Sequence, residues 1–165
     1  MKWQLYIQFN MIGRNLRNRW VSVGLDVNPG VTSEALAAFE SKYHVSLPAD
    51  LRDYFLAVNG MADGVSDDAL IRFWSLNEVK PITEGAPDYS DPSYSEDAAS
   101  LFLFADFCIW SHAYAIRLSA DGDGPNPVLA IGGEKPEKVF ASFSELVSSY
   151  LRDPDRLLAH LNETA

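Results

Sequence analysis

The sequence predicts an α+β fold: a mostly antiparallel sheet packed by an N-terminal helical hairpin and a C-terminal helix. Three observations predict it. Residues 11–60 hold capped segments with helical apolar spacing, residues 101–133 hold short runs rich in β-branched and aromatic side chains, and a capped amphipathic segment follows Ser142. A chain of 165 residues has the size of one domain with one core, so we assign residues 1–165 to a single domain.

Residues 11–20 have the spacing of a short helix, and the Asn-Pro-Gly of 26–30 predicts a turn. The next helix is predicted over 31–44, because Thr32 or Ser33 can cap its first free amides. Its inward stripe consists of Leu36, Phe39 and Tyr43. These elements begin the helical layer.

The stretch "LPADLRDYFLAVNG", residues 47–60, predicts the second helix of the hairpin. Pro48 suits the first helical position, where its missing N–H costs nothing, and Gly60 can close the helix in the left-handed conformation. One face collects the apolar side chains Leu51, Tyr54, Phe55 and Val58. No group on it suits chemistry, so we interpret this helix as packing.

Residues 69–76, "ALIRFWSL", predict a strand, and Ser75 with Glu78 forms a capping-box pattern for a brief helix. Residues 81–100 contain three prolines, one glycine, five acidic residues and no basic one. We expect a long loop there, and long loops in compact domains are functional or mobile.

Runs at 101–110, 112–119 and 128–133 predict a three-stranded antiparallel meander, with a turn at 121–127. Ser142 caps a final helix with Glu145 three residues later. Its buried face holds Phe143, Leu146, Val147, Tyr150 and Leu151, and Asp153-Pro154 interrupts it before a last amphipathic turn.

The charge distribution argues against two classes of partner. The net charge is -10, and residues 61–165 carry seven basic and eighteen acidic side chains. Such a chain repels phosphate backbones and anionic lipid, so we expect neither nucleic acid nor membrane as a partner. With Cys108 alone no internal disulfide forms, no leader or spanning segment is evident, and we expect a cytoplasmic protein with Cys108 buried.

Motifs for catalysis, metals and cofactors are weak. Ser111 and His112 are neighbours, which would point to opposite faces of a strand, and Cys108 would lie about 13 Å from His112 along it. "DGDGPN" lacks the later ligands of a calcium loop, and His44 and His160 have no zinc-site spacing. No nucleotide-binding glycine pattern occurs, so we expect no catalytic residue, no metal and no cofactor.

The acidic residues of the middle segment are the candidate site. They are Asp63, Asp67, Asp68, Glu84, Asp88, Asp91, Glu96 and Asp97, and the aromatic side chains Trp74, Tyr89 and Tyr94 lie among them. Three uses are open: plain solvation, a catalytic carboxylate pair, and recognition of a basic protein by aromatic anchors with acidic neighbours. Recognition is the functional use that we favour.

The order of these elements resembles the SUKH superfamily of Smi/Knr-like proteins. The resemblance is carried by residues 25–60, with a mid-helix "FE", an "LP" entry and an "NG" exit. Further matching pieces are "FWSLNEV" (73–79), "LFLFADF" (101–107), "YAIRL" (114–118) and "VFASFSELVSSYL" (139–151). Residues 1–10 carry no motif of the family, and they are interpreted as an extra edge strand or a partner contact.

The resemblance implies one α+β domain without catalytic activity. Many bacterial members are immunity proteins that neutralise a toxin made by the same cell, and fungal relatives are regulatory or scaffolding proteins. The resemblance also implies that the residues of the family motif have structural roles. It identifies no binding residue here, since the contact surface varies with each toxin. The motif positions here are Phe39, Leu47, Pro48, Gly60, Trp74 and Phe143.

The leading hypothesis is therefore a non-enzymatic immunity protein that blocks a basic toxin domain, such as a nuclease, with its acidic surface. The alternative is a regulatory or scaffolding module with no toxin partner. A hydrolase using loop carboxylates ranks last.

Overall fold

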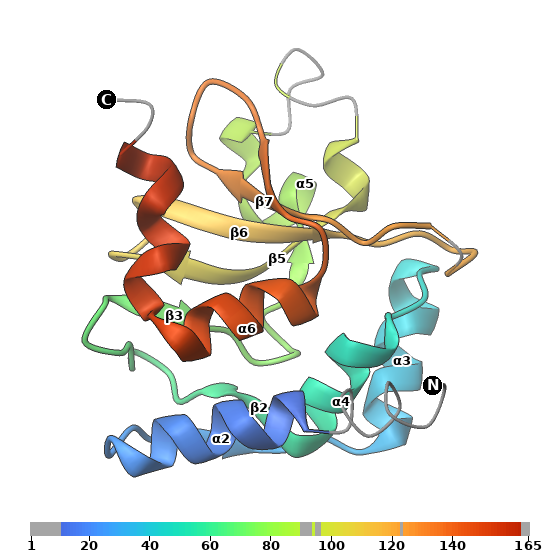
Figure 1. The fold of residues 1–165 in the computed structure, drawn as a ribbon. Helices are drawn as coiled ribbons and strands as arrows, with labels where there is room; N and C mark the ends of the chain where they lie inside the picture. Colours follow the sequence, from blue (N-terminus) through green and yellow to red (C-terminus); the bar gives the residue numbers. More distant parts are fainter. Residues whose placement is uncertain (1–10, 90–93, 95–96, 123, 163–165) are drawn as a thin grey trace, which may run out of the picture.

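The fold is α+β, as predicted. An antiparallel sheet built from strands between residues 71 and 140 carries helices from the N-terminal and C-terminal parts of the sequence on one face (Figure 1). This computed structural model describes residues 11–89, 94, 97–122 and 124–162, without the side chains of 160–162. The interpretation of residues 1–10 lies outside these ranges, as do Asp91, Glu96 and the His160 side chain.

The N-terminal helices form where their caps and apolar spacing predict them. They are α2 (Ile12–Ser22), α3 (Ser33–Tyr43) and α4 (Ala49–Ala57). Thr32 caps α3, since its Oγ1 accepts a hydrogen bond from the Ala35 N–H at 3.2 Å. Pro48 is the residue before α4 and not its first helical residue. Helix α4 packs against α2 and, further on, against the C-terminal helix, while Phe39 of α3 packs on the sheet.

The prediction of a turn at 26–30 is wrong, because this segment contains a strand, β1 (Val27–Pro29). This strand pairs antiparallel with β2 (Val58–Met61), and the Asn28 amide donates to the carbonyls of Asn59 and Met61. The paired residues lie far apart in the sequence, as Val27 with Met61 and Pro29 with Val58. Local turn chemistry therefore gave way to a non-local pairing.

Gly60 does not close α4, contrary to the prediction. Helix α4 ends at Ala57, Val58 is already extended, and Gly60 lies within β2 with a φ of 72°. A Cβ on Gly60 would lie 2.5 Å from the carbonyl carbon and oxygen of Trp74. The glycine is needed both for its left-handed backbone and for the close approach of β2 to the chain after β3.

The predicted meander is present and belongs to a larger sheet. Its strands are β5 (Leu101–Phe107), β6 (His112–Arg117) and β7 (Val128–Ile131). The sheet adds β3 (Ile71–Phe73), β4 (Lys80–Pro81) and β8 (Glu137–Phe140), in the order β3-β5-β6-β7-β8 with β4 also on β5. The capping box predicted at Ser75 forms only in part, because the Glu78 carboxylate accepts from the Ser75 N–H and hydroxyl, while the Glu78 N–H donates to the Ser75 carbonyl. The segment is a turn and not the predicted helix.

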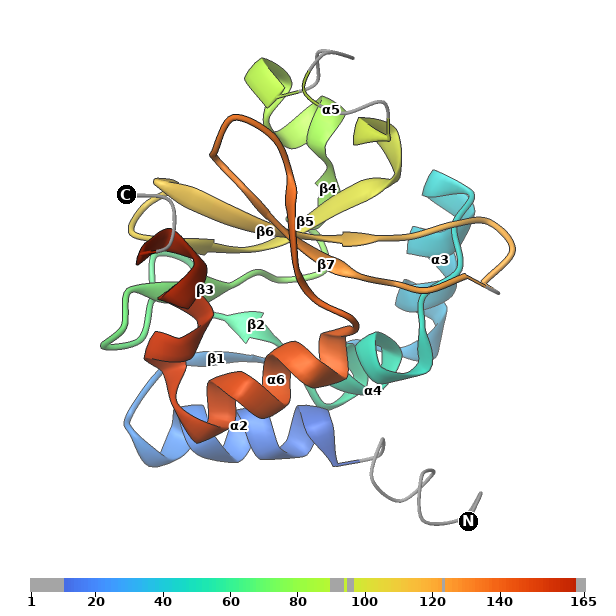
Figure 2. The same cartoon turned by 45° about the horizontal axis from the view of Figure 1, so that its top comes forward.

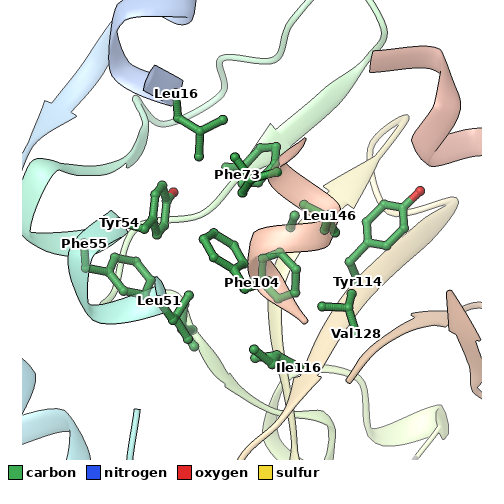
Figure 3. Close-up of a cluster of buried hydrophobic side chains, with 14 of the residues drawn as sticks. Leu16, Leu51, Tyr54, Phe55, Phe73, Phe104, Tyr114, Ile116, Val128 and Leu146 are labelled. Atoms are coloured by element: carbon green, nitrogen blue, oxygen red, sulfur yellow. The ribbon is translucent and has the colours of Figure 1, made fainter. Parts of the chain in front are cut away.

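The sheet is buried on both faces. The larger core lies between the sheet and the helices and contains most of the large aromatic side chains (Figure 3). The second face is covered by the described parts of the predicted long loop, which contain α5 (Ile82–Gly85), η1 (Pro87–Tyr89) and η2 (Ala98–Ser100). Its apolar side chains pack on small residues such as Ala113 and Ala115.

The C-terminal helix α6 (Phe143–Arg152) begins as predicted. The Ser142 hydroxyl accepts a hydrogen bond from the Glu145 N–H at 3.1 Å. Buried Asp50 of α4 accepts hydrogen bonds from both the backbone N–H and the hydroxyl of Ser144, which joins the two helix starts. After Pro154 the chain continues as η3 (Pro154–Asn162).

Of the six motif positions, Phe39, Leu47, Gly60, Trp74 and Phe143 are buried, and Pro48 is half-buried.

Candidate protein-interaction surface

The acidic residues of the candidate site fall into two groups. Asp63, Asp67 and Asp68 lie in the segment that leads into β3, and Glu84, Asp88 and Asp97 lie on or beside α5, η1 and η2. Ile71 pairs with Phe107 at one end of β5, whereas Pro81 pairs with Phe102 near the other. Five residues of strand separate these pairs by about 17 Å. The two segments leave the sheet in different directions (Figure 2).

The group near α5 is exposed but not wholly unpaired. The Tyr43 hydroxyl donates to Glu84 at 3.3 Å, and Arg117 forms an ion pair with Asp97 at 2.9 Å. Asp88 is exposed on η1. Such surface contacts contribute little to stability.

The rings of Tyr89 and Tyr94, two of the predicted aromatic contact residues, lie against each other. Their ring centroids lie 5.0 Å apart, and both rings pack on the second core. The Tyr94 hydroxyl accepts a hydrogen bond from the Gly132 N–H at 3.3 Å, and burial raises the pKa of Tyr94. Both rings are therefore half-buried and held in place.

Two members of the candidate site have structural roles instead. Trp74 is only 2% exposed, and its indole N–H donates to Asp106 at 2.5 Å, so it presents no contact area. Asp67 accepts hydrogen bonds from the Ile71 N–H at 2.8 Å and the Tyr150 hydroxyl at 2.6 Å. Sequence order places both near the acidic residues, but Trp74 is buried and the Asp67 carboxylate is occupied by hydrogen bonds within the fold.

An apolar surface that the sequence reasoning missed lies beside the first acidic group. Ile109 is 94% exposed, Leu70 49% and Trp110 44%. Cys108, expected to be buried, is exposed. The strand predicted to run through residue 110 ends at Phe107, and no glycine, proline or asparagine in "FCIWS" signals that end.

These residues line a hollow of about 380 Å³, which we call the Ile109 hollow. Its walls are formed by Leu70, Arg72, Asp106, Cys108, Ile109 and Trp110, with Asp63 at one side. The backbone is left-handed at four of the residues that line the hollow, with φ values of 61° at Leu70, 49° at Cys108, 51° at Ile109 and 69° at Trp110.

The turn that carries Ile109 is held firmly. The Cys108 N–H donates to the Leu70 carbonyl at 2.9 Å, and the Ser111 N–H and hydroxyl both donate to the Phe107 carbonyl at 3.1 Å. The Trp110 ring contacts the Trp74 ring, with centroids 4.8 Å apart. The hollow is therefore preformed.

Charged groups form the polar wall of the hollow. Arg72 contacts Glu78 at 2.6 Å and Asp63 at 3.5 Å. Burial alone would raise the pKa of Glu78, but hydrogen bonds from Arg72 and Ser75 hold it below its ordinary value. Asp106 is 4% exposed and accepts from the Trp74 indole and, at 3.4 Å, from the Trp110 N–H. Among the ion pairs of the described residues, none includes Asp106.

Groups suited to chemistry are sparse in the described part of the chain. The Ser111 hydroxyl donates to a backbone carbonyl, and Cys108 and His112 lie on either side of a turn and not along one strand. Residues 11–89, 94, 97–122 and 124–162 hold no group of three His, Cys, Asp or Glu side chains placed to bind a metal ion. No helix in these ranges is long and apolar enough to cross a bilayer.

Comparison with known families places the chain. No curated protein matches the sequence. The model of one family, described as SMI1 / KNR4 family (SUKH-1), matches residues 30–149, from just before α3 to the last turn of α6. That range is most of the chain and includes both acidic groups and the Ile109 hollow. The chain belongs to the SMI1/KNR4 family (SUKH-1).

Proposed function

We propose that this chain is a cytoplasmic, non-enzymatic immunity protein that binds and neutralises a bacterial toxin domain with a basic surface, such as a nuclease. Membership of the SMI1/KNR4 family is the observation that carries the proposal. The net charge of -10 narrows the partner, because an acidic protein attracts a basic one and repels nucleic acid.

The proposed contact residues are the exposed carboxylates of the predicted set and its two half-buried tyrosines. In the described ranges they are Asp63, Asp68, Glu84, Asp88, Asp97, Tyr89 and Tyr94. Complementary charge raises the rate of encounter, and half-buried tyrosines give contact area at small entropic cost. A nuclease cleft that is blocked by such a surface cannot bind its own substrate.

Co-expression with the product of the neighbouring gene tests the proposal. We expect the two proteins to co-purify and the cell to survive the toxin only when this chain is present. If the neighbour encodes no toxin and a cellular protein co-purifies instead, the regulatory or scaffolding alternative of the same family replaces the proposal.

Charge reversal tests the acidic contact itself. The double variant Glu84→Lys, Asp88→Lys should slow association with the toxin domain and flatten its dependence on salt. The variant Asp121→Lys, Asp155→Lys changes the net charge equally at exposed positions on other elements and serves as the control. Equal association rates for the two variants would show that the charge near α5 does not guide the partner.

A further inference from the structure

We propose that the Ile109 hollow grips a protruding segment of the protein partner in which one Lys or Arg side chain is flanked by apolar residues. The inference rests on the proposed function and deepens it, since it names the surface that holds the toxin and the chemistry of the segment held. The acidic group near α5 then guides the encounter, and the hollow holds the partner.

The first support is the backbone of the turn. A left-handed backbone is strained at residues other than glycine, most of all at a β-branched residue such as Ile109, and glycine would remove that strain. The Ile109 side chain is almost fully exposed, so it returns little burial energy to the isolated protein. Folding gives no reason for a large apolar side chain there, whereas contact with a partner does.

The second support is that the apolar side chains gather in one place. Leu70 and Ile109 are both exposed, and the Leu70 carbonyl accepts the hydrogen bond of the Cys108 N–H at 2.9 Å, so the two turns are joined. With Trp110 they surround one hollow. A partly exposed tryptophan beside aliphatic side chains is the composition of an interface hot spot.

The third support is the charge of the wall. Arg72 is the cross-strand neighbour of Asp106, but its guanidinium is paired with Glu78 and Asp63, so these four side chains together keep an excess of negative charge. The Asp106 carboxylate is buried at the hollow, and its hydrogen bonds come from neutral N–H groups. A carboxylate removed from water is stabilised by a nearby cation. The occupant that fits is therefore cationic.

The dimensions limit the occupant to part of a protein. A hollow of about 380 Å³ lies at the small end of the range for ligand sites, enough for one long side chain and its neighbours. Because the turn is already rigid, it loses little conformational entropy on binding. A loop that inserts an apolar-flanked Lys or Arg uses the charge and the apolar rim together.

The probe is the capped tripeptide Leu-Arg-Leu amide, with Leu-Glu-Leu amide as the charge control. We expect the Arg peptide to shift the NMR signals of the Ile109 amide and the Trp110 indole saturably in the millimolar range. The Glu peptide should leave them in place, and Asp106→Asn should weaken the response. Absence of saturable shifts, or equal shifts with both peptides, would overturn the inference.

The toxin domain recovered by co-expression supplies the second arm. Ile109→Ala should weaken its binding by about 30-fold, the loss of one hot-spot side chain, mainly through faster dissociation. Leu56→Ala removes an exposed apolar side chain from α4 and should have no effect. Equal binding by both variants defeats the inference and leaves the immunity role standing. If the Arg peptide binds as expected but co-expression recovers no toxin, only the proposed function is overturned and the binding chemistry of the hollow stands.

Discussion

The indole N–H of Trp20 donates a hydrogen bond of 2.8 Å to the hydroxyl of Tyr150, which lies 130 residues later in the chain. The same hydroxyl donates to Asp67 at 2.6 Å. One side chain of α6 thus joins α2 to the segment that leads into β3 and to the Ile109 hollow. The two ends of the sequence together support the part of the surface that we assign to the partner.

Replacing Tyr150 by Phe should lower the free energy of unfolding by about 1–3 kcal/mol, because the buried Trp20 N–H loses its acceptor and Asp67 loses a donor. Urea denaturation measures the loss. Tyr43→Phe is the control, since it removes an exposed hydroxyl bond of 3.3 Å and should change stability by less than about 0.5 kcal/mol. Similar losses in the two variants would mean that the buried bonds contribute nothing special.

Gly60→Ala should destabilise the protein by about 2–5 kcal/mol. It adds a left-handed alanine, at about 1–2 kcal/mol, and a Cβ that overlaps the Trp74 backbone. Gly24→Ala separates the two effects, because Gly24 has a φ of 79° with no atom within 4 Å of the added Cβ. Thermal unfolding should show the smaller loss for Gly24→Ala, and an equal loss would argue against the close approach of β2 to Trp74.

Ile109→Gly should keep or raise stability, by up to about 1 kcal/mol, because glycine adopts the left-handed backbone without strain. Val23→Gly, at an ordinary φ of -100° and half-exposed, should instead lower stability by about 0.5–1 kcal/mol. Chemical denaturation of both variants gives the comparison. A loss at Ile109 as large as that at Val23 would show that the turn is not strained.

Glu78 makes a contribution to stability that depends on pH. Its pKa in the folded protein lies below the ordinary 4.5, so this contribution is fully present above 4.5 and is lost as the pH falls through the folded pKa. Glu78→Gln should therefore be less stable than the unchanged protein at about pH 7, and the difference should shrink towards about pH 3. If the difference in unfolding free energy between Glu78→Gln and the unchanged protein stayed constant with pH, the Arg72–Glu78 contact would not be the source of the stabilisation.

Features that depend on residues close together in the sequence could be predicted from it. Thr32 and Ser142 cap their helices because a hydroxyl accepts from the backbone three residues later, and that pattern can be seen in the sequence. The buried face of α4 follows from its spacing in the same way. Family membership was also predicted from motifs that are core positions.

Features that depend on contacts between residues far apart in the sequence could not be predicted from it. Residues 26–30 have turn chemistry, yet Val27 pairs with Met61. The irregular register between Leu103 and Ala105 shifts the pattern of β5, and Asp106 then faces Arg72 on β3. The turn at 108–110 has the residues of a strand, so neither its left-handed backbone nor the exposure of Ile109 can be seen before the fold is known.

The central claim is that this chain acts by binding and not by catalysis. The most direct measurement is a titration of the purified chain into the activity assay of the toxin domain that its neighbouring gene encodes. We expect toxin activity to fall linearly and reach zero at one equivalent, as for a tight stoichiometric complex. Full toxin activity in excess of this chain, or its complete loss at a small fraction of an equivalent, would contradict the claim.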